Sequence, residues 1–121
     1  MRPGTDKLLT KAERAAYAAG ASLDAGAAEM AGARAFYAML YAAKALLNER
    51  AVRLQSHARI IEALNRERPP AAPQLAEWLA SALERRRNGD AGELTAEEAA
   101  RLVERAGQVV AAVRGGGLRR V

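Results

Sequence analysis

The chain has 121 residues, 50% of them hydrophobic, and a formal net charge of +5. This length predicts a single domain over residues 1–121, which buries about two-thirds of the surface that the unfolded chain would expose. The sequence contains no cysteine, no set of metal ligands and no signal-peptide-like apolar run in MRPGTDKLL, so we expect a cytoplasmic protein without a disulfide, metal or cofactor.

Alanine dominates the hydrophobic fraction, with 31 residues. Alanine lets helix backbones approach closely but buries little area, and burial contributes only about 25 cal/mol per Å². The hydrophobic core of such a monomer would be thin, so we expect a homodimer in which a second copy covers part of the central helices. The positive charge comes mainly from 16 arginines spread along the chain, which permits contacts with RNA or an acidic protein but equally describes a solvated surface.

The first half of the chain predicts two long helices. The first runs from about Thr5 to Leu23, with an uncertain start because Thr10 to Glu13 could form an internal capping box. After the turn SLDAG, the second runs from about Ala27 to Glu49 and contains the almost uninterrupted apolar stretch AFYAMLYAAKALL. A helix that is apolar on nearly all sides is normally buried, and this one is too short to span a bilayer, which needs roughly 20 apolar residues. We therefore expect it to be the central helix, without a membrane partner. Gly32 within it indicates a close helix contact.

The second half predicts three shorter helices. Ser56 is placed to cap a helix that begins at His57 and ends at the proline-rich segment RPPAAP. A fourth helix covers about Pro73 to Arg87, with Asn88-Gly89 as its stop. TAEE forms a capping box for a fifth helix, and residues 115–121 form a frayed tail. The sequence thus predicts an all-α, up-and-down bundle of about five helices.

His57 is the only histidine and the main candidate for chemistry. One interpretation is a packed or capping side chain. The other is catalytic, because Arg50 and Arg53 precede it closely and could fold back beside the imidazole. An imidazole moves protons near neutral pH, and guanidinium groups stabilise negative charge on phosphate oxygens, a combination that suits phosphodiester chemistry. Because cleavage by the RNA 2′-hydroxyl uses a base and an acid, one histidine per chain implies a symmetric dimer with two such histidines facing one cleft.

Other residues are candidates for substrate binding rather than catalysis. Together with Arg53, they are Ser56 beside the histidine and Arg86 within the run Arg85-Arg86-Arg87. That run either complements the dipole of the fourth helix or lines the rim of a cleft for RNA or a partner. Tyr37 and Tyr41, one turn apart, are interpreted as core or dimer packing, and Arg34 as an internal pair with Glu29 or Asp90.

The stretch RAFYAMLYAAKALL, followed at a fixed distance by Ser56-His57, resembles the HEPN domain family of small helical bundles, with the likeness covering nearly the whole chain. The resemblance implies a four- or five-helix bundle that usually dimerises. It also implies a pairing with a small nucleotidyltransferase in a toxin–antitoxin-like two-gene system. Many members are metal-independent endoribonucleases that act at an arginine, four to six residues and a histidine, which here are Arg50 and His57.

Several positions depart from the active family pattern. Ala51 replaces the polar residue that usually follows the arginine, and Arg59 and Ile60 stand where some members have a tyrosine. Asp90-Ala91 retains half of an aspartate–tyrosine pair. Three functions therefore stay open: an endoribonuclease using His57 and Arg50 at a dimer cleft, a non-catalytic module that binds a nucleotidyltransferase or a nucleotide, and a helical scaffold for other proteins.

Overall fold

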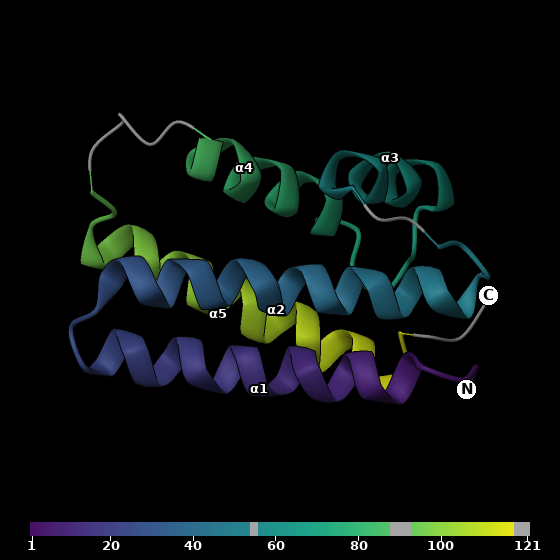
Figure 1. Ribbon diagram of the computed structural model, residues 1–121, viewed down its shortest axis with the longest axis horizontal. Coiled ribbons are helices and arrows are strands. Elements are labelled where there is room, and N and C mark those ends of the chain that lie inside the picture. The colour runs from purple at the N-terminus through teal and green to yellow at the C-terminus, as the bar shows by residue number, and fades with distance from the viewer. Residues whose placement is uncertain (54–55, 88–92, 118–121) are drawn as a thin grey trace.

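A computed structural model describes residues 1–53, 56–87 and 93–117, and these residues form an all-helical bundle (Figure 1). In chain order the elements are α1 (Thr5–Asp24), α2 (Ala28–Glu49), α3 (His57–Glu67), α4 (Leu75–Arg87), α5 (Ala96–Ala112) and the short π-helical turn η1 (Val113–Gly117). The predicted all-α bundle is confirmed. No helix in the described ranges combines the length and the apolar character needed to cross a membrane.

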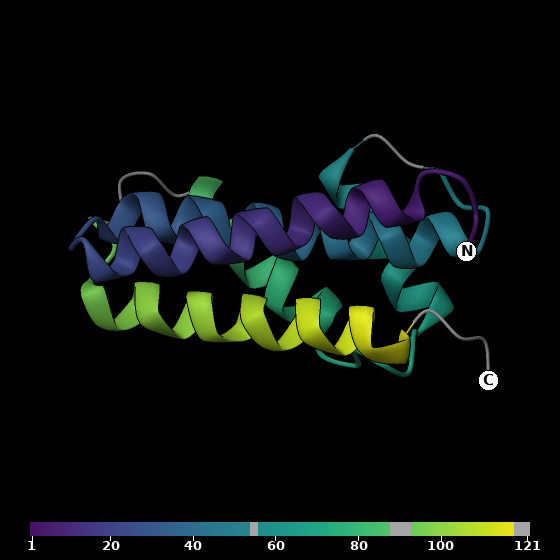
Figure 2. The same cartoon turned by 90° about the horizontal axis from the view of Figure 1, so that it is seen from below.

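The bundle is organised around α2, as the sequence predicts. Helices α1 and α2 lie antiparallel in one layer, α5 lies in a second layer behind them, and α3 and α4 follow the edge of α2 away from α1 (Figures 1 and 2). Helix α2 packs against each of α1, α3, α4, α5 and η1. Most of its side chains between Ala31 and Leu47 are buried. Half of the buried apolar residues in the described part of the chain are alanines, which explains how the long helices approach so closely.

Local signals set most helix ends where the sequence places them. The Ser56 hydroxyl accepts a hydrogen bond from the Arg59 backbone N–H at 3.2 Å and starts α3 at the predicted residue. The capping box of Thr95 and Glu98 is formed in both directions, with two hydrogen bonds of 3.1 Å. Gly32 lies at a close contact, as predicted, but its nearest neighbour is Leu94 in the segment before α5 rather than a helix residue, and a Cβ atom at this position would clash with a methyl carbon of Leu94.

The starts of α1 and α4 differ in how closely they follow the sequence. Helix α1 starts at Thr5, as predicted, and continues through Thr10, so the alternative start at an internal capping box is excluded. Helix α4 begins at Leu75 rather than Pro73. The turn η1 includes residues 115–117, with non-helical backbone angles at Gly116. Residues 118–121 and the Asn88-Gly89 stop lie outside the described residues, so the frayed tail stays a prediction.

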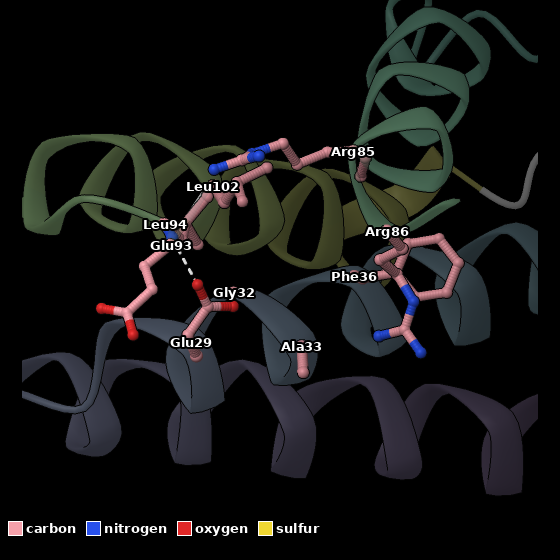
Figure 3. A pocket seen from close by; sticks show the side chains of 10 residues that line it. Glu29, Gly32, Ala33, Phe36, Arg85, Arg86, Glu93, Leu94 and Leu102 are labelled. Atoms are coloured by element: carbon pink, nitrogen blue, oxygen red, sulfur yellow. Dashed lines mark hydrogen bonds between the residues drawn. The ribbon is translucent and has the colours of Figure 1, made fainter. Parts of the chain in front are cut away.

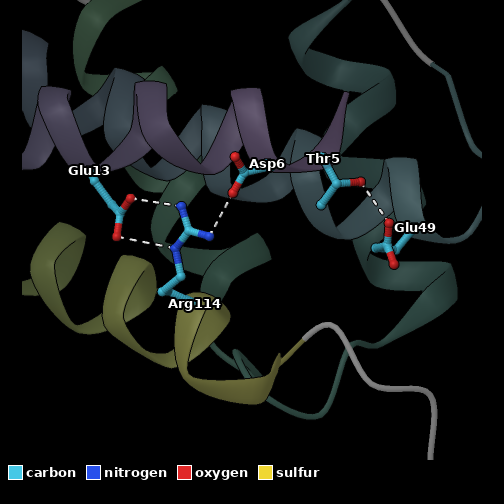
Figure 4. A network of polar contacts seen from close by, with 5 residues as sticks. All are labelled: Thr5, Asp6, Glu13, Glu49 and Arg114. Atoms are coloured by element: carbon cyan, nitrogen blue, oxygen red, sulfur yellow. Dashed lines mark hydrogen bonds and ion pairs between the residues drawn. The ribbon is translucent and has the colours of Figure 1, made fainter. Parts of the chain in front are cut away.

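Polar contacts connect the start of α1 and the turn η1 to their neighbours in the bundle (Figure 4). The Thr5 hydroxyl donates to Glu49 at 2.7 Å and accepts from Asn48 at 2.8 Å, which joins the start of α1 to the end of α2. This donation is the largest cause that holds the pKa of Glu49 below its usual value. The Arg114 guanidinium of η1 donates two hydrogen bonds to the Glu13 carboxylate, at 2.8 and 3.2 Å, and one to Asp6 at 2.9 Å. These carboxylates raise the pKa of Arg114, so the guanidinium stays charged.

Candidate functional site

The candidate site forms around the ring of Phe36, which is almost fully buried in α2. The imidazole of His57, at the first residue of α3, meets this ring edge to face, with 5.5 Å between ring centroids and 61° between the planes. The guanidinium carbon of Arg86, near the end of α4, lies 4.8 Å from the centre of the same ring. Three helices therefore bring one imidazole and one guanidinium onto a single aromatic side chain.

Arg86 also connects this cluster to the protein surface. Its guanidinium carbon lies 5.3 Å from the ring centre of Tyr37, whose side chain is 37% exposed. Within the described part of the chain Arg86 forms no ion pair with a carboxylate, and its guanidinium lies against two aromatic rings. Contacts of this kind are worth about 0.5–2 kcal/mol, which leaves the cation able to bind an incoming anion.

A pocket of about 400 Å³ lies beside Phe36 and Arg86, between α2, α4 and α5 (Figure 3). Its wall carries both signs of charge, because Glu29 and Glu93 line it together with Arg85 and Arg86. Two of these groups are engaged inside the protein. Glu29 accepts the backbone N–H of Leu94, and Arg85 pairs with Glu98 at 3.7 Å. Arg86 is therefore the lining cation best placed to meet a negatively charged ligand.

Arg50 lies elsewhere. Its guanidinium donates to the backbone carbonyl oxygen of Glu67 at 2.9 Å, and the side chain is only 12% exposed. Glu67 ends α3 whereas His57 begins it, and a rise of 1.5 Å per residue separates these ends by about 15 Å. Within one copy, the structure thus brings His57 and Arg86 to the same ring and places Arg50 at the other end of α3, contrary to the interpretation that Arg50 folds back beside the imidazole.

The remaining candidate residues are dispersed. Arg53 is exposed and lines a separate hollow of about 340 Å³ with Lys44 and Leu8, away from Phe36. Ser56 is next to His57 but uses its hydroxyl to cap α3. His57 is partly exposed, and neither of its ring nitrogens makes a hydrogen bond within the described residues. The structure describes no group of three His, Cys, Asp or Glu side chains that could hold a metal ion.

Two interpretations from the sequence need correction. Arg34 is exposed rather than internal, and it donates to the Ser22 hydroxyl at 2.8 Å instead of pairing with Glu29. Asp90, its other proposed partner, lies outside the described residues. Tyr37 is 37% exposed, so it is not a core residue, whereas its other interpretation, packing at a dimer interface, stays a prediction. Phe36 was missed as a site residue because it was grouped with the apolar helix, although it is the only phenylalanine in the chain.

The fold and the site define a small all-helical protein in which a histidine at the start of one helix and an arginine near the end of the next both pack on a phenylalanine of the central helix. The model of the HEPN domain family matches residues 5–116, and the chain belongs to this family. The resemblance seen in the sequence is thereby confirmed. A search of curated proteins finds none that matches the chain.

Proposed function

We propose that this HEPN protein is a metal-independent endoribonuclease in which His57 and Arg86 act on the scissile phosphate. The observation that carries the proposal is that both side chains lie on the ring of Phe36, at 5.5 and 4.8 Å from its centre. The imidazole and the guanidinium are therefore no farther apart than these two distances together. Arg86 takes the phosphate-binding role that the motif spacing assigned to Arg50.

The chemistry follows from these two groups. An imidazole accepts the proton of the RNA 2′-hydroxyl, the 2′-oxygen attacks the adjacent phosphorus, and the bond to the 5′-oxygen breaks. A guanidinium fork stabilises the negative charge that grows on the non-bridging oxygens during this step. The leaving 5′-oxygen needs a proton from a second group. The products are a 2′,3′-cyclic phosphate and a 5′-hydroxyl end.

A homodimer completes the scheme, because the same histidine of a second copy supplies the proton for the leaving group. The proposal also includes a small nucleotidyltransferase as the antitoxin-like partner of a cytoplasmic two-gene pair, which is the setting that the family suggests. A gene for such an enzyme beside this one would support the pairing. Its absence, together with failure of the protein to co-purify with a nucleotidyltransferase from its own cells, would contradict it.

A second candidate is a non-catalytic module that binds the nucleotidyltransferase or a nucleotide. The observation that favours it is the position of Arg50, whose guanidinium is held at the far end of α3 by Glu67. In this case His57 and Arg86 bind a phosphate without promoting its cleavage. The two candidates make different predictions for the same assay.

The test is cleavage of a 5′-labelled RNA in EDTA, with quantification of 2′,3′-cyclic phosphate ends. We expect His57→Ala and Arg86→Ala to slow cleavage by about 100-fold or more, the usual range for removal of a proton-transfer group or a charge-stabilising donor. Arg87→Ala, the next residue on α4, serves as the matched control and should cleave normally. Equal cleavage by wild type and His57→Ala, or none by either, removes the nuclease and leaves the binding module.

A further inference from the structure

The exposed side of α2 carries a stripe of basic and aromatic side chains. Arg34, Tyr37, Tyr41 and Lys44 follow one another at intervals of three or four residues, which places them on one face of the helix. Each of these four residues is at least partly exposed. The sequence contains no aspartate or glutamate between Met30 and Asn48, so this stripe has no acidic residue of its own.

Helix α1 also carries its positive side chains on one face and its negative side chains on another. Lys7, Lys11 and Arg14 share one face by their spacing of four and three residues. The carboxylates of Asp6 and Glu13 lie on a different face, where they bind Arg114 of η1 (Figure 4). The basic face borders the stripe on α2, because the Lys11 ammonium lies 5.7 Å from the ring centre of Tyr41. The two stripes form one surface, the lysine–tyrosine face, which consists of Lys7, Lys11, Arg14, Arg34, Tyr37, Tyr41 and Lys44.

The cations of this face are not neutralised inside the protein. Within the described residues, Lys7, Lys11, Arg14 and Lys44 form no ion pair with a carboxylate. Lys11 and Lys44 instead flank the Tyr41 ring, at 5.7 and 5.9 Å from its centre. All three lysines of the chain belong to this face. Among the described helices, none covers the side of the α1–α2 layer opposite α5 (Figure 2).

We infer that the lysine–tyrosine face binds single-stranded RNA, with lysine and arginine side chains on the phosphates and the two tyrosine rings stacked on bases. Positive side chains interleaved with accessible aromatic rings are the combination that binds single-stranded nucleic acid without sequence readout. The face also adjoins the candidate site, because Arg86 lies over Tyr37 as well as Phe36. A strand held here therefore runs toward His57, and this inference deepens the proposed function and rests on it.

The charge pattern argues against two other occupants. A second copy of the chain would bring cations against cations if it used the same face, and like charges in contact are costly. An acidic protein segment would satisfy the lysines and arginines but would offer the rings of Tyr37 and Tyr41 no partner of their own kind, although Tyr37 is 37% exposed. Bases and phosphates together satisfy both kinds of side chain.

The experiment measures binding separately from cleavage. The probe is a fluorescent 2′-O-methyl RNA of about 12 nucleotides that cannot pair with itself and lacks the attacking hydroxyl. Binding is followed by fluorescence anisotropy at several salt concentrations. The variants are Lys11→Glu, Lys44→Glu and Tyr37→Ala, and the charge-matched control is Arg101→Glu on the exposed side of α5. Circular dichroism checks that each variant retains the helical fold.

We expect each lysine-to-glutamate substitution to weaken binding by about tenfold at low salt and to make binding less dependent on salt. Each phosphate contact to single-stranded nucleic acid contributes about 0.7 to the slope of the logarithm of the binding constant against the logarithm of the salt concentration. Tyr37→Ala should weaken binding at least about fivefold without changing the slope, because stacking is not an ionic contact. Arg101→Glu should bind as wild type does.

Three results would overturn the inference. The first is equal weakening by Arg101→Glu and Lys11→Glu, which would mean that net charge alone attracts the RNA. The second is no effect of Tyr37→Ala, and the third is competition by poly-glutamate as effective as by unlabelled RNA. Because the probe cannot be cleaved, a failed nuclease assay leaves this binding result interpretable, and a failed binding assay leaves the cleavage result interpretable.

Discussion

Replacing Arg50 by alanine separates a structural role from a catalytic one. In the structure its guanidinium donates to the carbonyl oxygen of Glu67 at 2.9 Å and lies 3.9 Å from the Glu67 carboxylate. The last carbonyl groups of a helix have no partner within the helix, and a cation there also complements the helix dipole. We therefore expect Arg50→Ala to weaken the C-terminal end of α3 while leaving His57 and Arg86 in place.

The size of the effect follows from the nature and burial of the contact. A hydrogen bond from a charged donor contributes about 1.5–3 kcal/mol, and the dipole interaction is part of the same contact rather than an addition to it. Because the side chain is only 12% exposed, solvent screens the interaction little. We expect the free energy of unfolding to fall by about 2 kcal/mol, and Tm to fall by about 10 °C for a domain of this size.

Arg66→Ala is the matched control, because Arg66 pairs with the same Glu67 carboxylate at 3.5 Å but is 62% exposed. Exposed pairs of this kind contribute little, so its unfolding free energy should change by less than about 0.5 kcal/mol. Urea unfolding at pH 7 gives both values, and the cleavage assay at a temperature where all variants are folded gives the activity. The reasoning is refuted if Arg50→Ala is as stable as Arg66→Ala and has lost cleavage about 100-fold, since Arg50 would then belong to the reaction site.

Two further predictions concern how helix ends are held. The Thr5 hydroxyl, followed by the Arg2 backbone N–H, lowers the pKa of Glu49, so the folded protein binds the Glu49 proton less tightly than the unfolded chain does. The resulting stability is present above about pH 4.5, the ordinary pKa of a glutamate, and is lost as the pH falls through the lowered pKa. Urea unfolding at pH 7, 5 and 3.5 should show a smaller acid-induced loss for Glu49→Gln than for wild type, and parallel curves would contradict this assignment. Thr95→Ala removes the side-chain acceptor that starts α5, and we expect it to reduce the free energy of unfolding by about 1 kcal/mol, measured by urea unfolding at pH 7. Thr95→Ser should retain most of that stability, and equal loss in both variants would exclude the cap as its source.

The helices could be predicted because their signals are local. Ser56 and the pair Thr95 and Glu98 act on backbone groups within one turn of their own position, so three or four consecutive residues contain the information. The central position of α2 could also be predicted, because an apolar sequence on all sides requires partners on all sides. Gly32 also indicated a close contact, because a glycine has no Cβ atom, although the sequence did not identify Leu94 as its neighbour.

The candidate site could not be assembled in this way. His57 and Arg86 are 29 positions apart in the chain, and they contact the same ring only because α3 and α4 pack against α2. No local pattern in the sequence contains that packing. The spacing rule favoured Arg50 because it lies seven residues before His57. That spacing fixes distance along the chain and not direction, and here the long arginine side chain reaches the opposite end of α3.

The alanine-rich composition connects the fold to the proposed functions. Alanines on the buried sides of α1 and α2 let these helices pack closely without large side chains. Few large side chains therefore remain that can hold residues from other helices. Phe36 is one of them, and it gathers His57 and Arg86 because its ring offers the large surface that the neighbouring alanines lack. On the adjacent face of α2, Tyr37 and Tyr41 are the large side chains beside the lysines. A single helix can thus hold the proposed reaction site at one edge and the proposed RNA-binding face beside it, with Arg86 in contact with both.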